Sequence, residues 1–191
     1  MIVTNNKIYR DKLLSFRNHG ITKDSKRLIK KDKAAWYHEM QDIGFNYRMT
    51  DIQAALGVSQ MKKLNTIIAK RSAVAKRYDQ EFRNLKNFIL PQRIVGRKSS
   101  WHLYTLRVAS DKKHIRDGLF KTLQKAGVGV QVHYIPIYEH PYYRSLGYKK
   151  GAFPHTELFS YSSISLPIFP LLSIKDQKKV IAVVKSFDKE L

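Results

Sequence analysis

The sequence contains no cysteine and no long apolar run, and each absence excludes a class of protein. Without cysteine the chain can form neither disulfides nor thiolate metal sites, and it has no cysteine nucleophile. No apolar run approaches the roughly 20 residues that span a bilayer, and the N-terminus has no signal-peptide layout. We therefore expect a soluble, cytoplasmic protein with no membrane partner and no metal site.

Acidic residues are scarce, since 15 Asp and Glu stand against 36 Lys and Arg, which gives a formal net charge of +21. Such a charge attracts phosphate-bearing partners. The basic residues nevertheless form only short runs, such as Lys30-Lys31 and Lys178-Lys179, within apparent helices where they suit a solvated face. Because zinc-ligand spacing, an RNA-binding aromatic signature and an arginine-rich tail are all missing, we do not expect a nucleic-acid binder. A phosphorylated or nucleotide-linked small molecule is equally compatible with the charge.

A chain of 191 residues with 43% hydrophobic residues can bury a core, and its first part predicts mixed structure. Residues 2–4 read as the end of a strand. Asn6 can cap a helix that runs to about His19, and Gly20 fits the position just past its end. The basic segment 21–43 lacks clear periodicity and predicts a long loop with a short turn of helix.

A polar, aromatic loop around Asn46 then leads into a strong helix start. Thr50 and Gln53 have the spacing of a capping box, in which both side chains satisfy backbone N–H groups of the first turn. Apolar positions from there to Phe82 recur at steps compatible with one helical stripe, which predicts a single helix roughly 50 Å long. Gln60 falls on the stripe and strict heptads are absent, so a coiled coil fits less well.

The remaining sequence predicts a small α/β lobe of strand, helix, strand and terminal helix. Residues 101–108 read as a strand and residues 111–126 as a helix that Gly127 ends. Strict alternation over residues 128–134 predicts a second strand. Ser173 can cap the last helix, which runs to the end of the chain.

Few residues stand out for chemistry. His133 and Gln131 share the polar face at the end of the second strand, where a loop can present functional groups, although a strand-end His is as simply explained by surface hydrogen bonding. The aromatic passage 138–144 can line a pocket or be a packed surface loop. There is no glycine-rich phosphate loop, paired-carboxylate signature or serine nucleophile elbow. From these residues alone the function stays open.

Four passages resemble the DegT/DnrJ/StrS family of sugar aminotransferases, which are fold type I pyridoxal-phosphate enzymes. Two stretches near the start of the chain, residues 2–6 and 16–21, are similar to the strand and helix that follow the family's lysine segment. Residues 44–57, beginning Gly-Phe-Asn-Tyr-Arg-Met-Thr-Asp, resemble its most recognisable C-terminal motif. Two more passages are similar in order, 129–136 (Gly-Val-Gln-Val-His-Tyr-Ile-Pro) and 163–170 (Ser-Ile-Ser-Leu-Pro-Ile-Phe-Pro). Within the family, enzymes of pseudaminic acid biosynthesis are the most similar.

The resemblance implies the C-terminal part of a fold type I transferase. Residues 1–50 would be a remnant of the large cofactor-binding domain, residues 51–84 a long linking helix, and residues 85–191 a small C-terminal α/β domain. It implies pyridoxal 5'-phosphate as cofactor in the complete enzyme, and transfer of an amino group, with glutamate as donor, to a 4-keto-6-deoxy nucleotide sugar. A homodimer, or pairing with a separate N-terminal half, is the implied assembly.

The resemblance also assigns the site residues. Asn46 matches a family Asn that reaches the cofactor or substrate of the neighbouring subunit, and Arg48 is a candidate for anion contact. Gln131, Val132, His133 and Tyr134 match a segment that contacts the nucleotide sugar. No lysine here stands in the family's Schiff-base motif, so the chain supplies no catalytic residue and is predicted to be inactive alone.

Two other interpretations stay open. The chain can be a basic binding or interaction protein, derived from this fold, that holds an acidic partner or a nucleic acid. It can also be a decayed product without activity.

Overall fold

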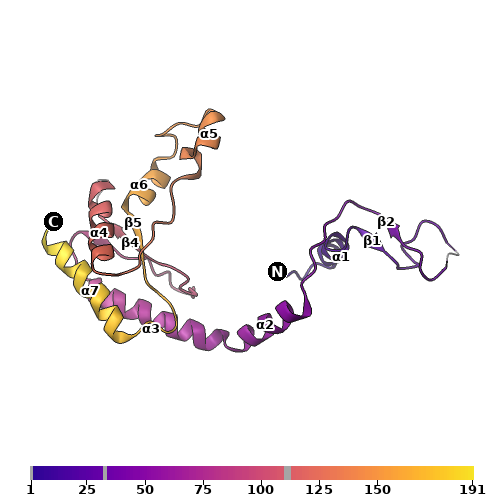
Figure 1. Cartoon of the computed structure of the whole chain (residues 1–191), viewed down its shortest axis with the longest axis horizontal. Coiled ribbons are helices and arrows are strands. Elements are labelled where there is room, and N and C mark those ends of the chain that lie inside the picture. Colours follow the sequence, from indigo (N-terminus) through magenta and orange to yellow (C-terminus); the bar gives the residue numbers. More distant parts are fainter. Residues whose placement is uncertain (1, 32–33, 110–112) are drawn as a thin grey trace. The chain divides into compact units, whose positions relative to one another are not determined.

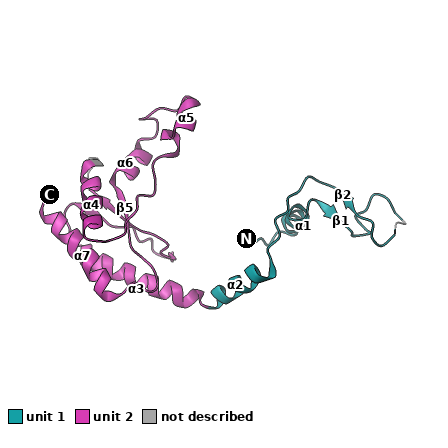
Figure 2. Ribbon diagram, in the orientation of Figure 1, with its two compact units in different colours: residues 1–62 teal, residues 63–191 magenta. Residues whose placement is uncertain are grey.

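The chain divides into two compact units, residues 1–62 and residues 63–191 (Figure 2). The computed structural model describes residues 2–31, 34–109 and 113–191. The elements of the first unit are α1 (Lys7–Phe16), β1 (Ile21–Thr22), β2 (Glu39–Met40) and α2 (Asp51–Lys62). The elements of the second unit are α3 (Leu64–Phe82), β3 (Phe88–Ile89), β4 (Tyr104–Val108), α4 (Lys113–Lys125), a 3-10 turn (Ile137–Glu139), α5 (Pro141–Ser145), α6 (Pro154–Ser162), β5 (Ser163–Leu166) and α7 (Ile174–Lys189) (Figure 1).

Helix α1 begins where the sequence predicts it. Asn6 Oδ1 accepts hydrogen bonds from the backbone N–H groups of Ile8 at 2.9 Å and Tyr9 at 3.2 Å, so Asn6 is the N-cap. The strand expected at residues 2–4 is wrong. Those residues form no strand, because no described strand lies beside them to complete a ladder.

Helix α1 ends at Phe16, about a turn earlier than the sequence predicts. The chain leaves the helix there because Asn18 pairs with Asn46 in an antiparallel bridge. Gly20 then takes a φ of +69°, which confirms the need for glycine after the helix. A Cβ at Gly20 would lie 1.9 Å from the carbonyl oxygen of Asp42, so a larger residue would push this loop apart.

The segment 21–43, expected as a loop with a helical turn, contains the antiparallel pair of β1 and β2. Glu39 on β2 closes the loop between them. Its carboxylate accepts the backbone N–H groups of Ile29 at 2.7 Å and Lys30 at 2.9 Å. These two bonds lower the pKa of Glu39, because they favour the charged carboxylate.

The capping box after the aromatic loop is confirmed. Thr50 N donates to Gln53 Oε1 at 3.0 Å, and Gln53 N donates to Thr50 Oγ1 at 3.3 Å. The single helix expected from Thr50 to Phe82 is wrong, because the helix is interrupted at Lys63, between α2 and α3.

Helices α2 and α3 differ in how many of their side chains are buried. Helix α2 buries none of its side chains, and its Ile52 and Leu56 are 84% and 61% exposed. The four buried residues of α3 are Val74, Ala75, Tyr78 and Phe82. The apolar stripe read from the sequence is therefore covered only where the second unit provides a core.

The second unit is built on an antiparallel sheet of order β3-β4-β5. Tyr104 of β4 lies opposite Leu166 of β5, and Leu106 lies opposite Ile164. All four side chains are buried, so one face of the sheet is the core face. Helices α3, α4 and α7 add further core residues, among them Tyr78, Phe82, Leu119, Leu123, Val180 and Val184.

The strand expected at residues 128–134 is wrong. Among residues 128–134, the sole pairing with a described strand is the isolated antiparallel bridge of Gln131 to Ser165 of β5. Val128 and Val130 are buried in the core, which explains the alternation in the sequence. Burial of alternate side chains produced the pattern without a continuous ladder of backbone hydrogen bonds.

Helices α4 and α7 follow their sequence signals. Helix α4 ends just before Gly127, which has a φ of +70°, while residues 111–112 of the expected helix lie outside the described residues. Ser173 Oγ accepts the backbone N–H of Asp176 at 3.0 Å and caps α7. No helix within the described ranges is long and apolar enough to cross a membrane.

Candidate functional site

The aromatic loop before α2 is held by the residues that follow α1. Phe45 N donates to Phe16 O at 2.6 Å, and Tyr47 N donates to Arg17 O at 3.0 Å. Gly44 is required at the start of the loop, because a Cβ there would lie 2.3 Å from the backbone nitrogen of Gly20. Two stretches far apart in sequence thus fix the loop that carries Asn46.

Asn46 and Arg48 form one polar cluster with Asn18. Arg48 Nε donates to Asn46 Oδ1 at 2.9 Å, and a terminal nitrogen of Arg48 donates to Asn18 Oδ1 at 3.3 Å. Both amide oxygens face the guanidinium, and Asn46 and Arg48 are exposed. Within the described residues Asn46 Nδ2 donates no hydrogen bond. The cluster therefore presents N–H donors to the solvent, which suits an anionic oxygen.

Apolar side chains surround the same loop. The rings of Phe45 and Tyr47 stack with centroids 4.9 Å apart and planes 16° apart. A cavity of about 710 Å³ lies in the first unit, and its mainly apolar walls include Ile2, Leu13, Phe16, Phe45 and Met49. A cavity of this size and lining is of the kind that holds a ligand or another segment of polypeptide.

The second group of sequence-predicted residues lies on the segment beside β5. Gln131 exchanges backbone hydrogen bonds with Ser165, at 2.8 Å for the Ser165 N–H and 3.4 Å for the Gln131 N–H. His133 Nδ1 lies 2.8 Å from Ser165 Oγ. Ser160 Oγ donates to the carbonyl oxygen of Tyr134 at 2.8 Å. Residues of α6 and β5 thus hold the segment at both ends.

The four side chains of this segment differ in exposure. Gln131 and Tyr134 are exposed, while Val132 and His133 are half-buried. The His133 ring meets Tyr134 edge-on, with centroids 4.6 Å apart. With Nδ1 engaged by Ser165, the Nε2 atom is the nitrogen of His133 left to meet a ligand.

Sequence reasoning missed two residues that shape these groups. Asn18 and Ser165 lie inside the family-like passages, but nothing in their spacing marked them as partners of Arg48 and His133. These partnerships arise from strand pairing, which the sequence did not define.

The aromatic passage 138–144 is partly structural. Tyr138 is buried and donates to Glu157 Oε1 at 2.5 Å, and the backbone N–H of Gly151 donates to the same oxygen. Burial raises the pKa of Tyr138, and the bond to Glu157 raises it further. The same bond lowers the pKa of Glu157. Tyr138 thus anchors the passage, while Tyr142 stays exposed.

The structure therefore brings the predicted residues into two groups. In the first unit Arg48 contacts both Asn46 and Asn18, and Asn18 follows α1 in the chain. Gln131 and His133 meet Ser165 in the second unit.

Comparison with known proteins places the whole chain in one family. The profile of the DegT/DnrJ/EryC1/StrS aminotransferases matches residues 1–185. An uncharacterised protein, MJ1066 of Methanocaldococcus jannaschii, is 38% identical over 100% of this chain and 50% of its own length. The UDP-4-amino-4,6-dideoxy-N-acetyl-beta-L-altrosamine transaminase of Campylobacter jejuni is 36% identical over 94% of this chain and 45% of its own.

A solved structure agrees. The chain matches Helicobacter pylori PseC, an aminotransferase involved in the biosynthesis of pseudoaminic acid, with a TM-score of 0.84 and 29% identity. The match covers 99% of this chain and 48% of PseC. The chain thus spans about half the length of the relatives that it matches. With residues 1–185 matched, the chain belongs to the DegT/DnrJ/EryC1/StrS aminotransferase family.

Proposed function

We propose that the chain is the C-terminal part of a pyridoxal-phosphate-dependent nucleotide-sugar aminotransferase. In the complete enzyme it would act in amino-sugar biosynthesis, on the route to pseudaminic acid, with a 4-keto-6-deoxy nucleotide sugar as acceptor and glutamate as donor. The family match over residues 1–185 carries this proposal. The names of the Campylobacter and Helicobacter relatives support the choice of substrate class.

The enzymes of this family use pyridoxal 5'-phosphate, and the donors of the Asn46 cluster fit the phosphate of that cofactor. The side-chain oxygens of Asn46 and Asn18 already accept hydrogen bonds from Arg48. Asn46 Nδ2 and the N–H groups of Arg48 that remain free can therefore donate to phosphate oxygens. Asn18 would hold Arg48 in place. We assign this cluster to the cofactor of a neighbouring subunit in a homodimer.

The segment of Gln131, Val132, His133 and Tyr134 would contact the nucleotide sugar. Its amide, imidazole and phenol groups can hydrogen-bond hydroxyl and phosphate oxygens, and its backbone is fixed by Ser160 and Ser165. A fixed backbone lowers the entropy that the protein loses when the ligand binds.

When bound, pyridoxal phosphate would accept the amino group and stabilise negative charge at the reacting carbon. No lysine of this chain matches the family's cofactor-binding lysine, so the chain would position cofactor and substrate without supplying the catalytic base. We therefore expect no transamination by the isolated chain. Residues 1–50 would belong to the large domain, 51–84 to the linking region and 85–191 to the small domain, in a cytoplasmic enzyme.

The test is to co-express this chain with the lysine-bearing half of the Campylobacter transaminase. We expect the chain alone to retain no pyridoxal phosphate on gel filtration, and the pair to retain it with the absorbance of lysine-bound cofactor. Asn46→Ala in the pair should weaken retention of the cofactor roughly tenfold, the loss of about one charge-assisted hydrogen bond.

Asn84→Ala is the matched control, because Asn84 is an exposed asparagine in the turn after α3. It should leave cofactor retention unchanged. Equal losses for Asn46→Ala and Asn84→Ala would remove Asn46 from the cofactor site. Failure of the pair to retain cofactor, although the two halves co-purify, would contradict the assignment as a complementing half.

A further inference from the structure

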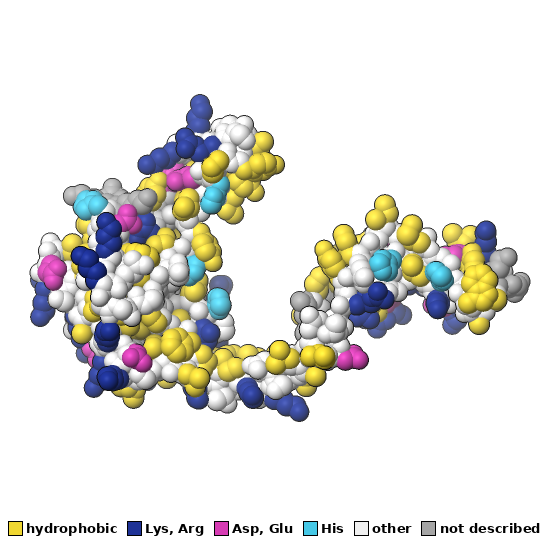
Figure 3. Space-filling view, in the orientation of Figure 1, with side chains coloured by type: hydrophobic (Ala, Val, Ile, Leu, Met, Phe, Trp, Pro, Cys, Tyr) yellow, Lys and Arg dark blue, Asp and Glu magenta, His cyan; other side chains and the backbone are white. Residues whose placement is uncertain are grey.

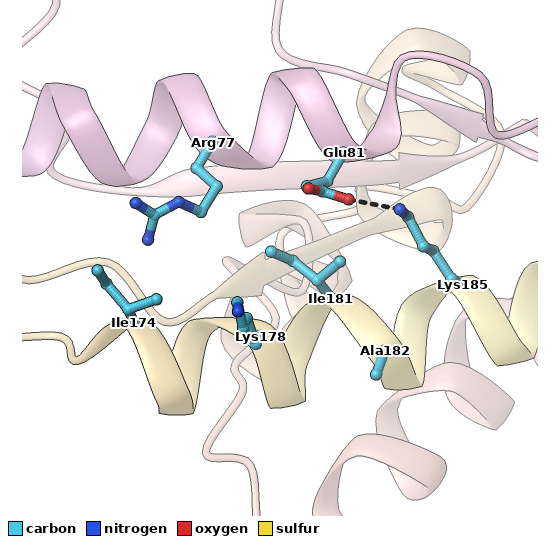
Figure 4. Close-up of a pocket in the computed structure, with 7 residues that line it drawn as sticks. All are labelled: Arg77, Glu81, Ile174, Lys178, Ile181, Ala182 and Lys185. Atoms are coloured by element: carbon cyan, nitrogen blue, oxygen red, sulfur yellow. Dashed lines mark hydrogen bonds and ion pairs between the residues drawn. The ribbon is translucent and has the colours of Figure 1, made fainter.

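A groove between α3 and α7 lies within the second unit and takes no part in the site proposed above. Its volume is about 430 Å³. The side chains that define it are Arg77 and Glu81 of α3 with Ile174, Lys178, Ile181 and Lys185 of α7 (Figure 4). In Figure 4 the two helices run alongside each other, and Arg77, Ile181 and the ion pair of Glu81 with Lys185 lie between them.

The two walls of the groove are locked together. Gln177 of α7 is 1% exposed, and its Nε2 donates to the carbonyl oxygen of Val74 at 2.8 Å. Its Oε1 accepts from Arg77 at 3.1 Å. The groove is therefore preorganised, so a partner would not have to order it on binding.

The floor of the groove is apolar and open. Ile174 is the first residue of α7 and is 57% exposed, whereas apolar side chains in the following turns of the helix are buried. Ile181 forms the floor of the groove further along α7. From Ile174 to Lys185 the groove extends ~16 Å along α7, which is about three turns of a helix. Side chains at such spacing form a ridge against which another helix can pack.

The charge of the groove is positive and only partly compensated. Lys185 is paired with Glu81 at 2.5 Å. Lys178 and Arg77 form no ion pair within the described residues, and the guanidinium of Arg77 uses one donor on Gln177. Residues 63–191 carry 24 lysines and arginines against nine aspartates and glutamates. The surrounding field would therefore steer an acidic partner toward this face.

We propose that the α3–α7 groove is a docking site for an acidic amphipathic helix of a partner protein. Leucine-like side chains of that helix would pack on Ile174 and Ile181, and its carboxylates would pair with Arg77 and Lys178. A nucleic acid fits less well, because no aromatic side chain of the groove offers a stacking platform and Glu81 repels phosphate. A small ligand would stay largely exposed between only two helices.

The probe is a fluorescein-labelled peptide of about 16 residues, with leucines on one helical face and glutamates beside them. Its binding to the full chain is measured by anisotropy at physiological ionic strength, beside a scrambled peptide of the same composition and a single-stranded RNA. We expect the amphipathic peptide to bind at least about tenfold more tightly than the scrambled one, a difference of about 1.4 kcal/mol.

The double variant Arg77→Glu with Lys178→Glu should lose about tenfold in peptide affinity. The matched control is Lys121→Glu with Lys125→Glu, which makes the same charge change on the exposed face of α4 and should change affinity less than about twofold. Ile174→Gln tests the apolar contact without altering charge, and should weaken binding about threefold to fivefold.

Three results would overturn the proposal. The first is no binding of the amphipathic peptide, and the second is equal binding of the scrambled peptide. The third is equal losses in the two double variants, with the RNA bound more tightly than the peptide, because that would describe a general polyanion surface. Circular dichroism of each variant checks the fold, and Ile174→Gln decides the matter if Arg77→Glu unfolds the chain.

Discussion

The two units of the chain are stabilised in different ways. Every buried hydrophobic residue among those described belongs to residues 63–191, where β4, β5, α3, α4 and α7 enclose a core. In residues 1–62 the described buried residues are Gly20 and Thr22. The second unit therefore gains the hydrophobic term that dominates folding, and the first unit gains little of it.

Hydrogen bonds hold the first unit in its shape instead. They include the cap of α1, the bridge of Asn18 to Asn46, the capping box of α2 and the carboxylate of Glu39 in its loop. Figure 3 shows hydrophobic side chains along α2 and around α1 on the visible surface. Exposed hydrogen bonds contribute little net stability, so the first unit combines an exposed apolar surface with weak internal stabilisation.

A pair of large-to-small substitutions gives the strongest test of this difference. Phe82→Ala in the core should cost about 3–5 kcal/mol in the free energy of unfolding, because Phe82 is fully buried. Leu56→Ala on α2 should change it by less than about 0.5 kcal/mol. Urea denaturation followed by circular dichroism measures both values. An equally large loss for Leu56→Ala would break the comparison, since the face of α2 would then have to be covered in solution.

The two groups of site residues allow a smaller, matched test. Ser165→Ala should cost about 1 kcal/mol, because it removes the hydroxyl beside His133 Nδ1 in a largely buried place. It should also shift the ¹⁵N resonances of the His133 ring, and Ser165→Thr should restore them. Asn18→Ala, which removes an exposed hydrogen bond to Arg48, should cost only a few tenths of a kcal/mol. Unchanged His133 resonances in Ser165→Ala would show that the serine does not orient the ring.

Lowering the pH should produce the smallest difference in stability between the two units. Hydrogen bonds from the hydroxyl of Tyr138 and the N–H of Gly151 lower the pKa of Glu157. The charged carboxylate therefore stabilises the folded state above the unfolded pKa of about 4.3. This stabilisation is lost as the pH falls through the pKa of Glu157 in the folded state. The melting temperature of the second unit should therefore fall in acid, and less so in Glu157→Gln. The pKa of Glu39 in the first unit is also lowered, so its contribution to stability is likewise lost in acid. Its protonation should weaken the bonds from the amides of Ile29 and Lys30 and from the Tyr37 hydroxyl, and amide exchange against pH will measure the first two. A melting temperature equally steep in Glu157→Gln would contradict this role.

Capping signals were the most reliable part of the sequence. Asn6, Ser173 and the pair of Thr50 and Gln53 all form the predicted hydrogen bonds. Such bonds connect residues two or three positions apart, so they depend on local sequence alone. Gly20 and Gly127 were likewise predicted from position and adopt positive φ.

Longer-range features were not predictable in this way. The break at Lys63 and the missing strand at 128–134 both depend on which surface covers an apolar pattern, and alternate burial looks the same with or without a strand partner. Helices α5 and α6 carried no prediction. The partners of the site residues, Asn18 and Ser165, come from pairing across the fold, which one sequence does not specify.

By itself the sequence determined the local starts and stops of helices, the excess of positive charge and the family, because these depend on residue type and order. The tertiary structure decided where the core lies, where the long apolar pattern is interrupted and which side chains hold Arg48 and His133. The physical reason is that burial and strand pairing join residues far apart in the chain, so their free energy depends on the whole packed unit.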